Sequence, residues 1–381
     1  MTTQKTIPQN IKEIQQDKQF QEFCILRNLK KGSQNGYATI LLRYLKCHQM
    51  TFKELIQEAE DEEETIPRLS KRKIKQRVIK YKIYMQENNY SNQTINDSIT
   101  KIKTIYSHFD ITTPKIPKNK TKKYNYTEII TKEDIQKALE HCNLKMKAII
   151  LFMCSSGTAI KEVSNLTIQD FIDALDEYHD NEQIFLLVRE LLKKDNLVPT
   201  FHITRQKTDT PYFTFCSPEA THYILLYLYD RLMNKGITSL DEKLFEVSSN
   251  TLIHNFRRLN DRCEFGWMRD THRYFHSHAL RKFFATSLLG AGVSELTIDF
   301  LEGRSISGVH GAYFKPSPKQ LRQVYINALE YITILSEFRF NTINSDEKIE
   351  LERYRIREKE MFKQIEHLEQ IVNKYFDIEE L

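Results

Sequence analysis

The chain has 381 residues, of which 40% are hydrophobic and 28% charged, and its formal net charge is +5. No apolar run is long enough to span a membrane, and the six cysteines are scattered without a Cys-x-x-Cys pair. This composition argues against a membrane protein, a disulfide framework and a zinc finger, and the polar first 20 residues predict a cytoplasmic protein without a signal peptide.

The first 110 residues are predicted to form a polar arm followed by a small helical domain. Residues 1–32 are polar, which indicates an arm. From residue 33 to residue 110, apolar residues recur at helical spacing in about four segments, and the turn-rich segment Asn88–Thr94 separates the last two. The pattern therefore predicts about four helices over residues 33–110.

A strongly basic block overlaps this helical domain. Residues 66–125 contain 15 Lys and Arg against 3 Asp and Glu, a local net charge of +12, just after the acidic run Glu58–Glu64. Positive charge interleaved with Tyr81, Tyr84 and Tyr106 favours binding to double-stranded DNA, although a solvated helix face has the same pattern. The residues predicted to contact DNA are Lys71, Arg72, Lys73, Lys75, Arg77, Lys80, Lys118, Lys120, Lys122 and Lys123.

Residues 111–128 are predicted to be an extended basic linker. The segment has two Pro, five Lys between Lys115 and Lys123, and no apolar periodicity. A linker of this kind would let two domains close around a duplex from opposite faces. The alternative is a plain surface loop.

Residues 129–338 are predicted to form a second, mainly helical domain with one small antiparallel sheet. A helix capped by Thr131 and an apolar helix over Met146–Met153 come first. The segments 184–188, 198–203 and 211–215 are predicted strands, and residues 205–210 are predicted to form the hairpin turn between the last two. Helices are predicted again from Ser217 onward.

The segment from His278 to Tyr313 carries the chemistry. His278 and Arg281 form a His-x-x-Arg pair, and Arg304 follows a glycine at a predicted corner. Arginine presents a planar fork that suits phosphate oxygens, and tyrosine can act as a covalent nucleophile. Cations, a histidine and a tyrosine on one short segment indicate transfer of a phosphoryl group to the protein.

This segment resembles the C-terminal signature of the tyrosine recombinases, or phage-type integrases. Several spacings agree at once, and the likeness extends over about residues 33–335. Arg304 stands where the family usually has His or Trp, which favours the archaeal branch. The matching residues, in order, are His278, Arg281, Ala285, Thr286, Gly292, Leu301, Gly303 and Tyr313.

The resemblance implies a mainly α fold, with a helical core-binding (SAM-like) domain ahead of a catalytic domain. It also implies roles for individual residues. Tyr313 would attack phosphorus to give a 3′-phosphotyrosine link, and Arg281 would bind the non-bridging oxygens. His278 would assist proton transfer, and Lys207 in the predicted hairpin would protonate the leaving 5′ oxygen. Arg304 would contact the phosphate, or alternatively cap a helix. No metal or other cofactor is expected, and His272 and His276 near His278 lack further ligands at metal-binding spacing.

One family position is occupied differently. The segment from Ser155 to Thr167 matches the family's first arginine motif at Gly157, Ile160, Glu162 and Leu166, but Ala159 stands at the position of the arginine. Either this alanine blocks cleavage, or another residue supplies the missing cation. Arg205 is the candidate substitute, because it would share a strand face with Lys207.

Residues 345–378 are predicted to form a coiled-coil-like helix. Its apolar positions follow a heptad spacing, with Glu358 in one polar slot. Self-association or partner binding is expected, and an amphipathic helix docked on its own domain is the alternative. The heptad residues are Leu351, Tyr354, Met361, Ile365, Leu368, Val372 and Tyr375.

Together these features predict a site-specific recombinase that integrates or excises a mobile element. It would act as a homotetramer on paired DNA sites and be a dimer or monomer when free. The alternatives are a non-cleaving DNA-binding protein on a recombinase scaffold, a type IB topoisomerase-like enzyme, and a scaffold that oligomerises through its C-terminal helix.

Overall fold

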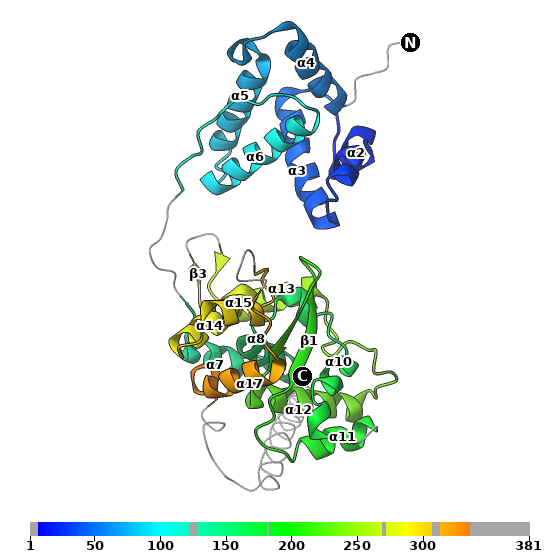
Figure 1. The fold of residues 1–381 in the computed structure, drawn as a ribbon, viewed down its shortest axis with the longest axis vertical. Coiled ribbons are helices and arrows are strands. Elements are labelled where there is room, and N and C mark those ends of the chain that lie inside the picture. Colours follow the sequence, from blue (N-terminus) through cyan, green and yellow to red (C-terminus); the bar gives the residue numbers. More distant parts are fainter. Residues whose placement is uncertain (1–6, 122–128, 181–182, 269–271, 307–312, 336–381) are drawn as a thin grey trace, which may run out of the picture. The chain divides into compact units, whose positions relative to one another are not determined.

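The computed structural model describes residues 7–121, 129–180, 183–268, 272–306 and 313–335. The chain divides into two compact units, Met1–Tyr126 and Thr127–Leu381. Most of the described chain is helical (Figure 1). No described helix is both long and apolar enough to cross a membrane. The predicted C-terminal coiled coil, Lys122 and Lys123 lie outside the described residues.

The first unit is a bundle of helices around one apolar core. The four helices that the pattern predicts between residues 33 and 110 are present, and Tyr44, Leu45, Val78 and Ile102 are among their buried residues. The helices are α1 (Ile11–Gln16), α2 (Lys18–Leu26), α3 (Lys31–His48), α4 (Phe52–Thr65), α5 (Lys73–Glu87) and α6 (Asn92–His108), with a 3-10 turn, η1 (Leu69–Lys71).

The prediction of a polar arm over residues 1–32 is wrong for α1 and α2. Asn10 and Asp17 cap these two short helices through their side chains. Phe20 and Phe23 are buried, and the Phe23 ring lies 5.0 Å from that of Tyr37. A few apolar residues among many Lys, Gln and Glu are enough to attach the segment to the bundle, and such sparse apolar content hides the helical period.

The described part of the predicted linker, residues 111–121, forms no helix or strand and is bound to the helical unit. Asn96 and Asn119 exchange two hydrogen bonds of 2.8 and 3.0 Å through the Asn96 side chain and the Asn119 backbone. The Lys82 ammonium donates to the Pro117 carbonyl at 3.0 Å, and Ile111 is buried. These contacts fix the backbone of residues 111–120 on α5 and α6.

The second unit is built around the apolar helix α8. Nearly every residue of α8 from Met146 onward is buried, and the neighbouring helices α12 and α14 pack against it. Its helices are α7 (Lys132–Glu140), α8 (Leu144–Ser156), α9 (Ile160–Val163), α10 (Ile168–Asp173), α11 (Ile184–Leu191), α12 (Pro218–Asn234), α13 (Ser249–Arg262), α14 (Ser277–Gly290), α15 (Glu295–Leu301), α17 (Pro318–Asn327) and α18 (Leu329–Ile332), with a 3-10 turn at Asp176–Tyr178.

Two short antiparallel hairpins complete this unit. Strands β1 (Thr200–Arg205) and β2 (Thr210–Phe215) pair from Thr200 opposite Phe215 to Arg205 opposite Thr210, so the predicted hairpin is confirmed. Strands β3 (Trp267–Met268) and β4 (His272–Arg273) form the other hairpin. The prediction of a strand at residues 184–188 is wrong.

That segment forms helix α11 because its apolar residues have a helical period. Leu187, Val188 and Leu191 are buried on one side of the helix, whereas Phe185 and Leu186 are 38% and 45% exposed. A short apolar run cannot by itself distinguish a strand from a buried helix.

Candidate active site and DNA-binding surface

Arg281 lies at the centre of a polar cluster in the second unit. Helix α14 holds the side chain in the interior, where the residue is only 5% exposed. Its Nη1 donates to the Gly157 carbonyl at 2.7 Å, and its Nη2 donates to the Glu302 carbonyl at 2.7 Å. Its Nε also lies 3.2 Å from Glu302 Oε1. Three of its nitrogens therefore have protein partners, which hold the guanidinium in one orientation.

Two further arginines converge on Glu302. The Nε of Arg304 lies 2.6 Å from Glu302 Oε2, and its Nη1 lies 3.0 Å from Asp299. Arg205, at the end of β1, donates from Nη1 to the Glu302 carbonyl. The Glu302 carboxylate is completely buried, whereas the Arg304 side chain is half exposed. Three guanidinium groups from separate parts of the sequence thus surround one residue.

Tight backbone turns make room for this cluster. Gly157 and Gly303 have φ values of +65° and +64°, in the left-handed region that glycine tolerates best. A Cβ atom would lie 2.4 Å from the Phe284 ring at Gly157 and 2.6 Å from the Tyr212 ring at Gly303. Both positions therefore require glycine, the first for the turn whose carbonyl binds Arg281 and the second for the turn between Glu302 and Arg304.

The electrostatics of the cluster follow from burial and charge. Burial lowers the pKa of Arg281, and the Glu302 carboxylate opposes that shift. Burial raises the pKa of Glu302, and Arg281 and Arg304 oppose this shift in turn. Each charge of the buried pair therefore offsets part of the desolvation cost of the other. Glu302 and Asp299 provide two negative charges against the three guanidinium groups, so one positive charge remains to favour an anion.

His278 is on the first turn of α14, close to the arginine cluster. Its side chain is exposed, but partial desolvation lowers the pKa of the imidazole, with smaller effects from Lys282, His276 and Arg281. A lowered pKa favours the neutral ring, which can accept a proton at neutral pH. Among the described residues, no group of three or more His, Cys, Asp and Glu side chains is arranged to hold a metal ion.

Lys207 lies in the β1–β2 turn, as predicted, and is exposed. The hairpin is fastened next to it, because the Gln206 backbone N–H donates to Glu162 Oε1 at 3.2 Å. Glu162 is buried and belongs to α9, three residues after Ala159. Because the backbone of the turn is held in place and the Lys207 side chain is long, its ammonium group can reach an atom of a molecule bound at the domain surface.

Tyr313 and Ala159 are not among the described residues that form a hydrogen bond or ion pair with Glu302. The Tyr313 side chain is 84% exposed, and its hydroxyl has no hydrogen bond to any residue that the structure describes. Residues 307–312, just before it, lie outside the described residues. Ala159 is the N-cap of α9 and makes no side-chain cap. The structure thus gathers Arg205, Arg281, Arg304 and His278, whereas the Tyr313 hydroxyl has no hydrogen bond to a described residue.

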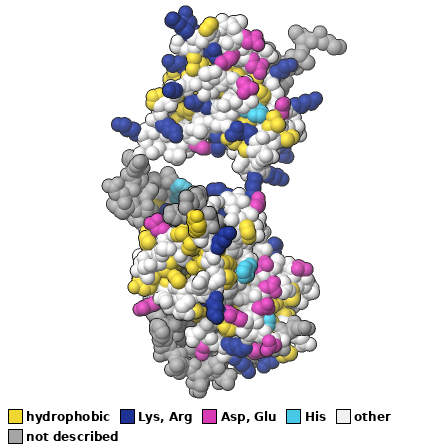
Figure 2. All heavy atoms as spheres, viewed as in Figure 1, with side chains coloured by type: hydrophobic (Ala, Val, Ile, Leu, Met, Phe, Trp, Pro, Cys, Tyr) yellow, Lys and Arg dark blue, Asp and Glu magenta, His cyan; other side chains and the backbone are white. Residues whose placement is uncertain are grey.

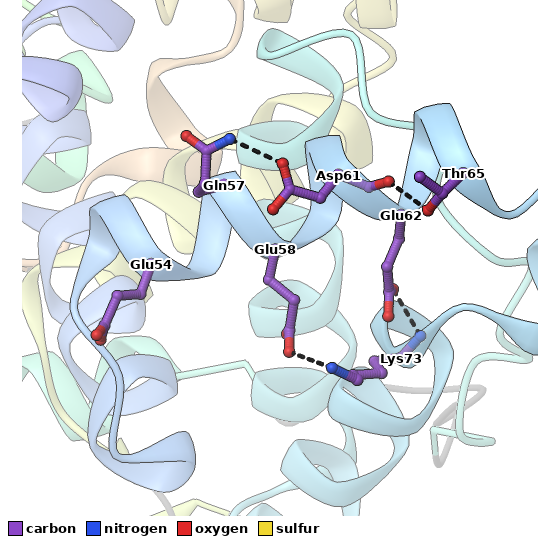
Figure 3. Close-up of a pocket in the computed structure, with 7 residues that line it drawn as sticks. All are labelled: Glu54, Gln57, Glu58, Asp61, Glu62, Thr65 and Lys73. Carbon is purple, nitrogen blue, oxygen red and sulfur yellow. Dashed lines mark hydrogen bonds and ion pairs between the residues drawn. The ribbon is translucent and has the colours of Figure 1, made fainter.

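The basic block of the first unit separates into paired and unpaired cations. Arg72 is buried and forms an ion pair with Glu63, while Lys73 and Arg77 pair with Glu58 on α4. Figure 3 shows Lys73 between Glu58 and Glu62. These residues line a depression with a volume of about 360 Å³. The charges of these three basic side chains are therefore directed at Glu58 and Glu63 of the acidic run on α4.

Several other described cations of this block are exposed to solvent. Side chains of Lys and Arg are spread over the face of the first unit seen in Figure 2. None of the exposed members of the predicted DNA-binding set that the structure describes is in an ion pair, apart from Lys73. They are Lys71, Lys75, Lys80, Lys118 and Lys120.

The interpretation of the interleaved tyrosines as DNA contacts is wrong for two of them. Tyr81 and Tyr106 are buried, and both rings pack edge-on against Tyr44, at 5.0 and 6.3 Å between centroids. Tyrosine at helical spacing is as compatible with a core as with a binding surface, and here the core requires both rings. Tyr84 is half-buried and stacks on Tyr81.

Sequence reasoning missed Glu302 and the structural role of Glu162. Glu302 is an acidic residue directly before the Gly303 corner, in a segment otherwise matched by apolar and basic residues. The sequence signal for a buried ion pair is limited to the position of Glu302, which follows the apolar Leu301 and lies two residues before Arg304. Glu162 matches the family motif in the sequence, but the motif alone did not predict that its carboxylate would hold the β1–β2 turn.

No family model matches the chain. Its relatives by sequence include the tyrosine recombinase XerC of Staphylococcus epidermidis, with 23% identity over 260 residues, covering 65% of this chain and 79% of that protein. XerC of Staphylococcus haemolyticus has 23% identity over 262 residues, with the same coverage. Among solved structures, the XerH site-specific recombinase bound to palindromic difH in a post-cleavage complex has 15% identity and a TM-score of 0.48, covering 85% of this chain and 90% of that chain.

Proposed function

We propose that this chain, a member of the tyrosine recombinase family, breaks and rejoins DNA strands at specific sites through a covalent bond to Tyr313. The observation that carries the proposal is the convergence of Arg205, Arg281 and Arg304 on Glu302. Three guanidinium groups at one point are suited to a phosphate that gains negative charge in its transition state. The biological reaction would be integration or excision of a mobile element.

The proposed reaction begins with attack of the Tyr313 oxygen on the scissile phosphorus. A Tyr–O–P bond forms as the bond between phosphorus and the 5′ oxygen breaks. The tyrosine proton passes to His278, whose lowered pKa favours a neutral acceptor, and Lys207 gives a proton to the leaving 5′ oxygen. The link retains the phosphodiester energy, so a 5′ hydroxyl of another strand can reverse the reaction without ATP.

The arginines would stabilise the charge on the non-bridging oxygens. Arg304 is half exposed and can donate directly, and Arg281 behind it has a fixed orientation. We propose that Arg205 supplies the cation that Ala159 lacks, because Arg205 shares the Glu302 carbonyl with Arg281. Loss of one donor in sites of this kind raises the barrier by about 3–4 kcal/mol, so a substitute at this position matters.

DNA would be held by both units. The exposed lysines of α5 and of residues 118–120 would contact phosphates on the first unit. Exchange between two duplexes breaks four strands, and one nucleophile per chain therefore calls for a tetramer on paired sites. The proposed compartment is the cytoplasm, and membership of the archaeal branch stays a prediction from Arg304.

A covalent-adduct assay tests this function. A binding site is first selected from random-sequence duplexes, and a nick is then placed beside the cut position so that the released fragment diffuses away. The chain should form a protein–DNA band on denaturing gels, and Tyr313→Phe should bind the site equally well without forming the band. If neither the chain nor Ala159→Arg gives any adduct on this site, the protein is a non-cleaving DNA-binding protein.

The same preparation separates two related activities. A recombinase should form recombinant DNA only when two selected sites are present. A plasmid that carries one site should remain supercoiled. Relaxation of a supercoiled plasmid without exchange between sites would instead indicate a topoisomerase.

A further inference from the structure

We propose that Glu302 is a positioning residue that sets the three arginines of the active site in place for the scissile phosphate, an inference that rests on the proposed function. Glu302 uses all of its oxygens for this purpose. Its Oε1 lies 3.2 Å from Arg281 Nε, and its Oε2 lies 2.6 Å from Arg304 Nε. Its carbonyl accepts from both Arg205 and Arg281.

The burial of the carboxylate sets this arrangement apart from a surface ion pair. The Glu302 side chain has no exposed area, and the side chain of Arg281 is 6% exposed. A mobile exposed pair would break readily, whereas a buried carboxylate between two guanidinium groups holds both. Donors that are fixed before the substrate binds need no reorganisation during the reaction, and they stabilise transition-state charge most effectively.

The two functions of Glu302 can be separated because they use different atoms. Substitution of the side chain leaves the carbonyl, which still accepts from Arg205 and Arg281. In Glu302→Gln one amide oxygen is left for either Arg281 Nε or Arg304 Nε, and the amide NH2 group would face the other guanidinium, which cannot accept from it. The expected result is misplaced donors in a domain that is still folded.

Glu302→Gln keeps the size of the side chain and removes its charge. In single-turnover cleavage of the nicked selected site, we expect adduct formation to slow by roughly tenfold to a hundredfold, with site affinity within about threefold of that of the unchanged protein. Glu302→Asp keeps the charge but shortens the side chain by one methylene group. Its rate of adduct formation should therefore lie between those of the unchanged protein and Glu302→Gln.

Glu219→Gln is the matched control. Glu219 is an equally buried carboxylate in the same unit, but it accepts from the backbone N–H groups of Ile334 and Leu335. Its variant should cleave at the rate of the unchanged protein.

A substrate with a methylphosphonate at the scissile position distinguishes positioning from general stability. A neutral methyl group replaces one charged oxygen, so the reaction depends less on correctly placed cations. On this substrate the difference between the unchanged protein and Glu302→Gln should shrink to about threefold or less. A difference of the same size on both substrates would show a structural role and overturn the proposal.

The outcomes keep this inference separate from the proposed function. If the unchanged protein forms no adduct, the function itself fails. If it forms adduct and Glu302→Gln is equally fast, only the role of Glu302 fails. Should Glu302→Gln not fold, as judged by its melting curve, Glu302→Asp decides, because an Asp variant as fast as the unchanged protein contradicts positioning.

Discussion

Arg205 and Glu302 are joined by a hydrogen bond from the guanidinium to the backbone carbonyl, although 97 positions separate them in the sequence. The same carbonyl accepts from Arg281. This shared acceptor brings the end of strand β1 next to helix α14. It therefore places a third cation beside two arginines of the segment His278–Tyr313, in a protein with Ala159 at the position where the family resemblance predicts an arginine.

The first prediction follows from this placement. Arg205→Ala should lower the single-turnover rate of adduct formation by about a hundredfold to a thousandfold, because one phosphate donor is lost. Arg205→Lys should retain part of the rate, since a point charge replaces the fork. Thr204→Ala, at an exposed neighbouring position on the same strand, is the control.

A double substitution tests whether Arg205 replaces the family arginine. The double variant Ala159→Arg, Arg205→Ala should form adduct at least tenfold faster than Arg205→Ala alone if both arginines contact the same phosphate. A single Arg205→Ala variant that cleaves as fast as the unchanged protein would show that Arg205 has no part in the chemistry.

The second prediction concerns the backbone at Gly157. Alanine there must adopt a φ of +65° and would also place Cβ 2.4 Å from the Phe284 ring. At Gly266 the φ is +72°, but nothing lies within 4 Å of the added atom. Gly266→Ala should thus lower the free energy of unfolding by about 1–2 kcal/mol, the strain alone. Gly157→Ala should lower it by at least about 1 kcal/mol more.

Urea unfolding of the two variants measures this difference. Equal losses of stability would mean that Phe284 moves aside at no cost. Gly157→Ala should in addition slow adduct formation, because the Gly157 carbonyl orients Arg281.

Local patterns in the sequence were sufficient for much of the fold. The helices between residues 33 and 110 and the hairpin around Lys207 follow from periodicity and turn residues, which act over a few positions. The segment from His278 to Tyr313 likewise indicated phosphoryl transfer to a tyrosine, because its cations, histidine and tyrosine lie close together in the sequence. The error at residues 184–188 arose because five apolar residues fit a strand as well as a helix.

The remaining features depend on contacts that no local pattern encodes. Glu302 becomes an acceptor for Arg205 only when β1 packs beside the end of α15. The pairing of Arg77 with Glu58 requires α4 to fold back along α5, which converts part of a basic block into neutral surface. Charge counted along the chain could not separate cations that bind DNA from cations that balance acids.

The third prediction is a loss of stability in mild acid caused by His48. Burial lowers the pKa of His48 to about 4, with help from Arg77 and Lys80, and its Nε2 is buried without a hydrogen-bond partner among the described residues. The folded protein therefore favours the neutral ring. Between about pH 6.5 and pH 4 the unfolded chain binds a proton that the folded chain does not, so stability falls as the pH falls through this window.

Thermal melting at pH 7 and pH 4.5 checks the prediction. The melting temperature of the unchanged protein should fall more than that of His48→Gln, which has no group to titrate at this position. The carboxylates titrate in both proteins, so their effect on the melting temperature cancels in the comparison. Equal decreases would mean that His48 is solvated in the folded protein.

The fourth prediction separates the two classes of cation on helix α5. Lys75 and Lys80 are exposed, whereas the Arg77 side chain is 19% exposed and is paired with Glu58. Each lysine that contacts a phosphate releases counterions, and this release makes the affinity for DNA depend on salt. Replacing Lys75 and Lys80 with Gln should therefore reduce the slope of log affinity against log salt by roughly 1–2.

Arg77→Gln provides the comparison on the same helix. Its charge is already balanced by Glu58, so this variant should leave the salt slope unchanged and instead lower the melting temperature, because a partly buried carboxylate loses one partner. Affinity for a random-sequence duplex measured between 50 and 200 mM salt gives the slopes. A larger change for Arg77→Gln than for the lysine pair would mean that the ion pair opens on DNA and that α4 moves away from α5 when the duplex binds.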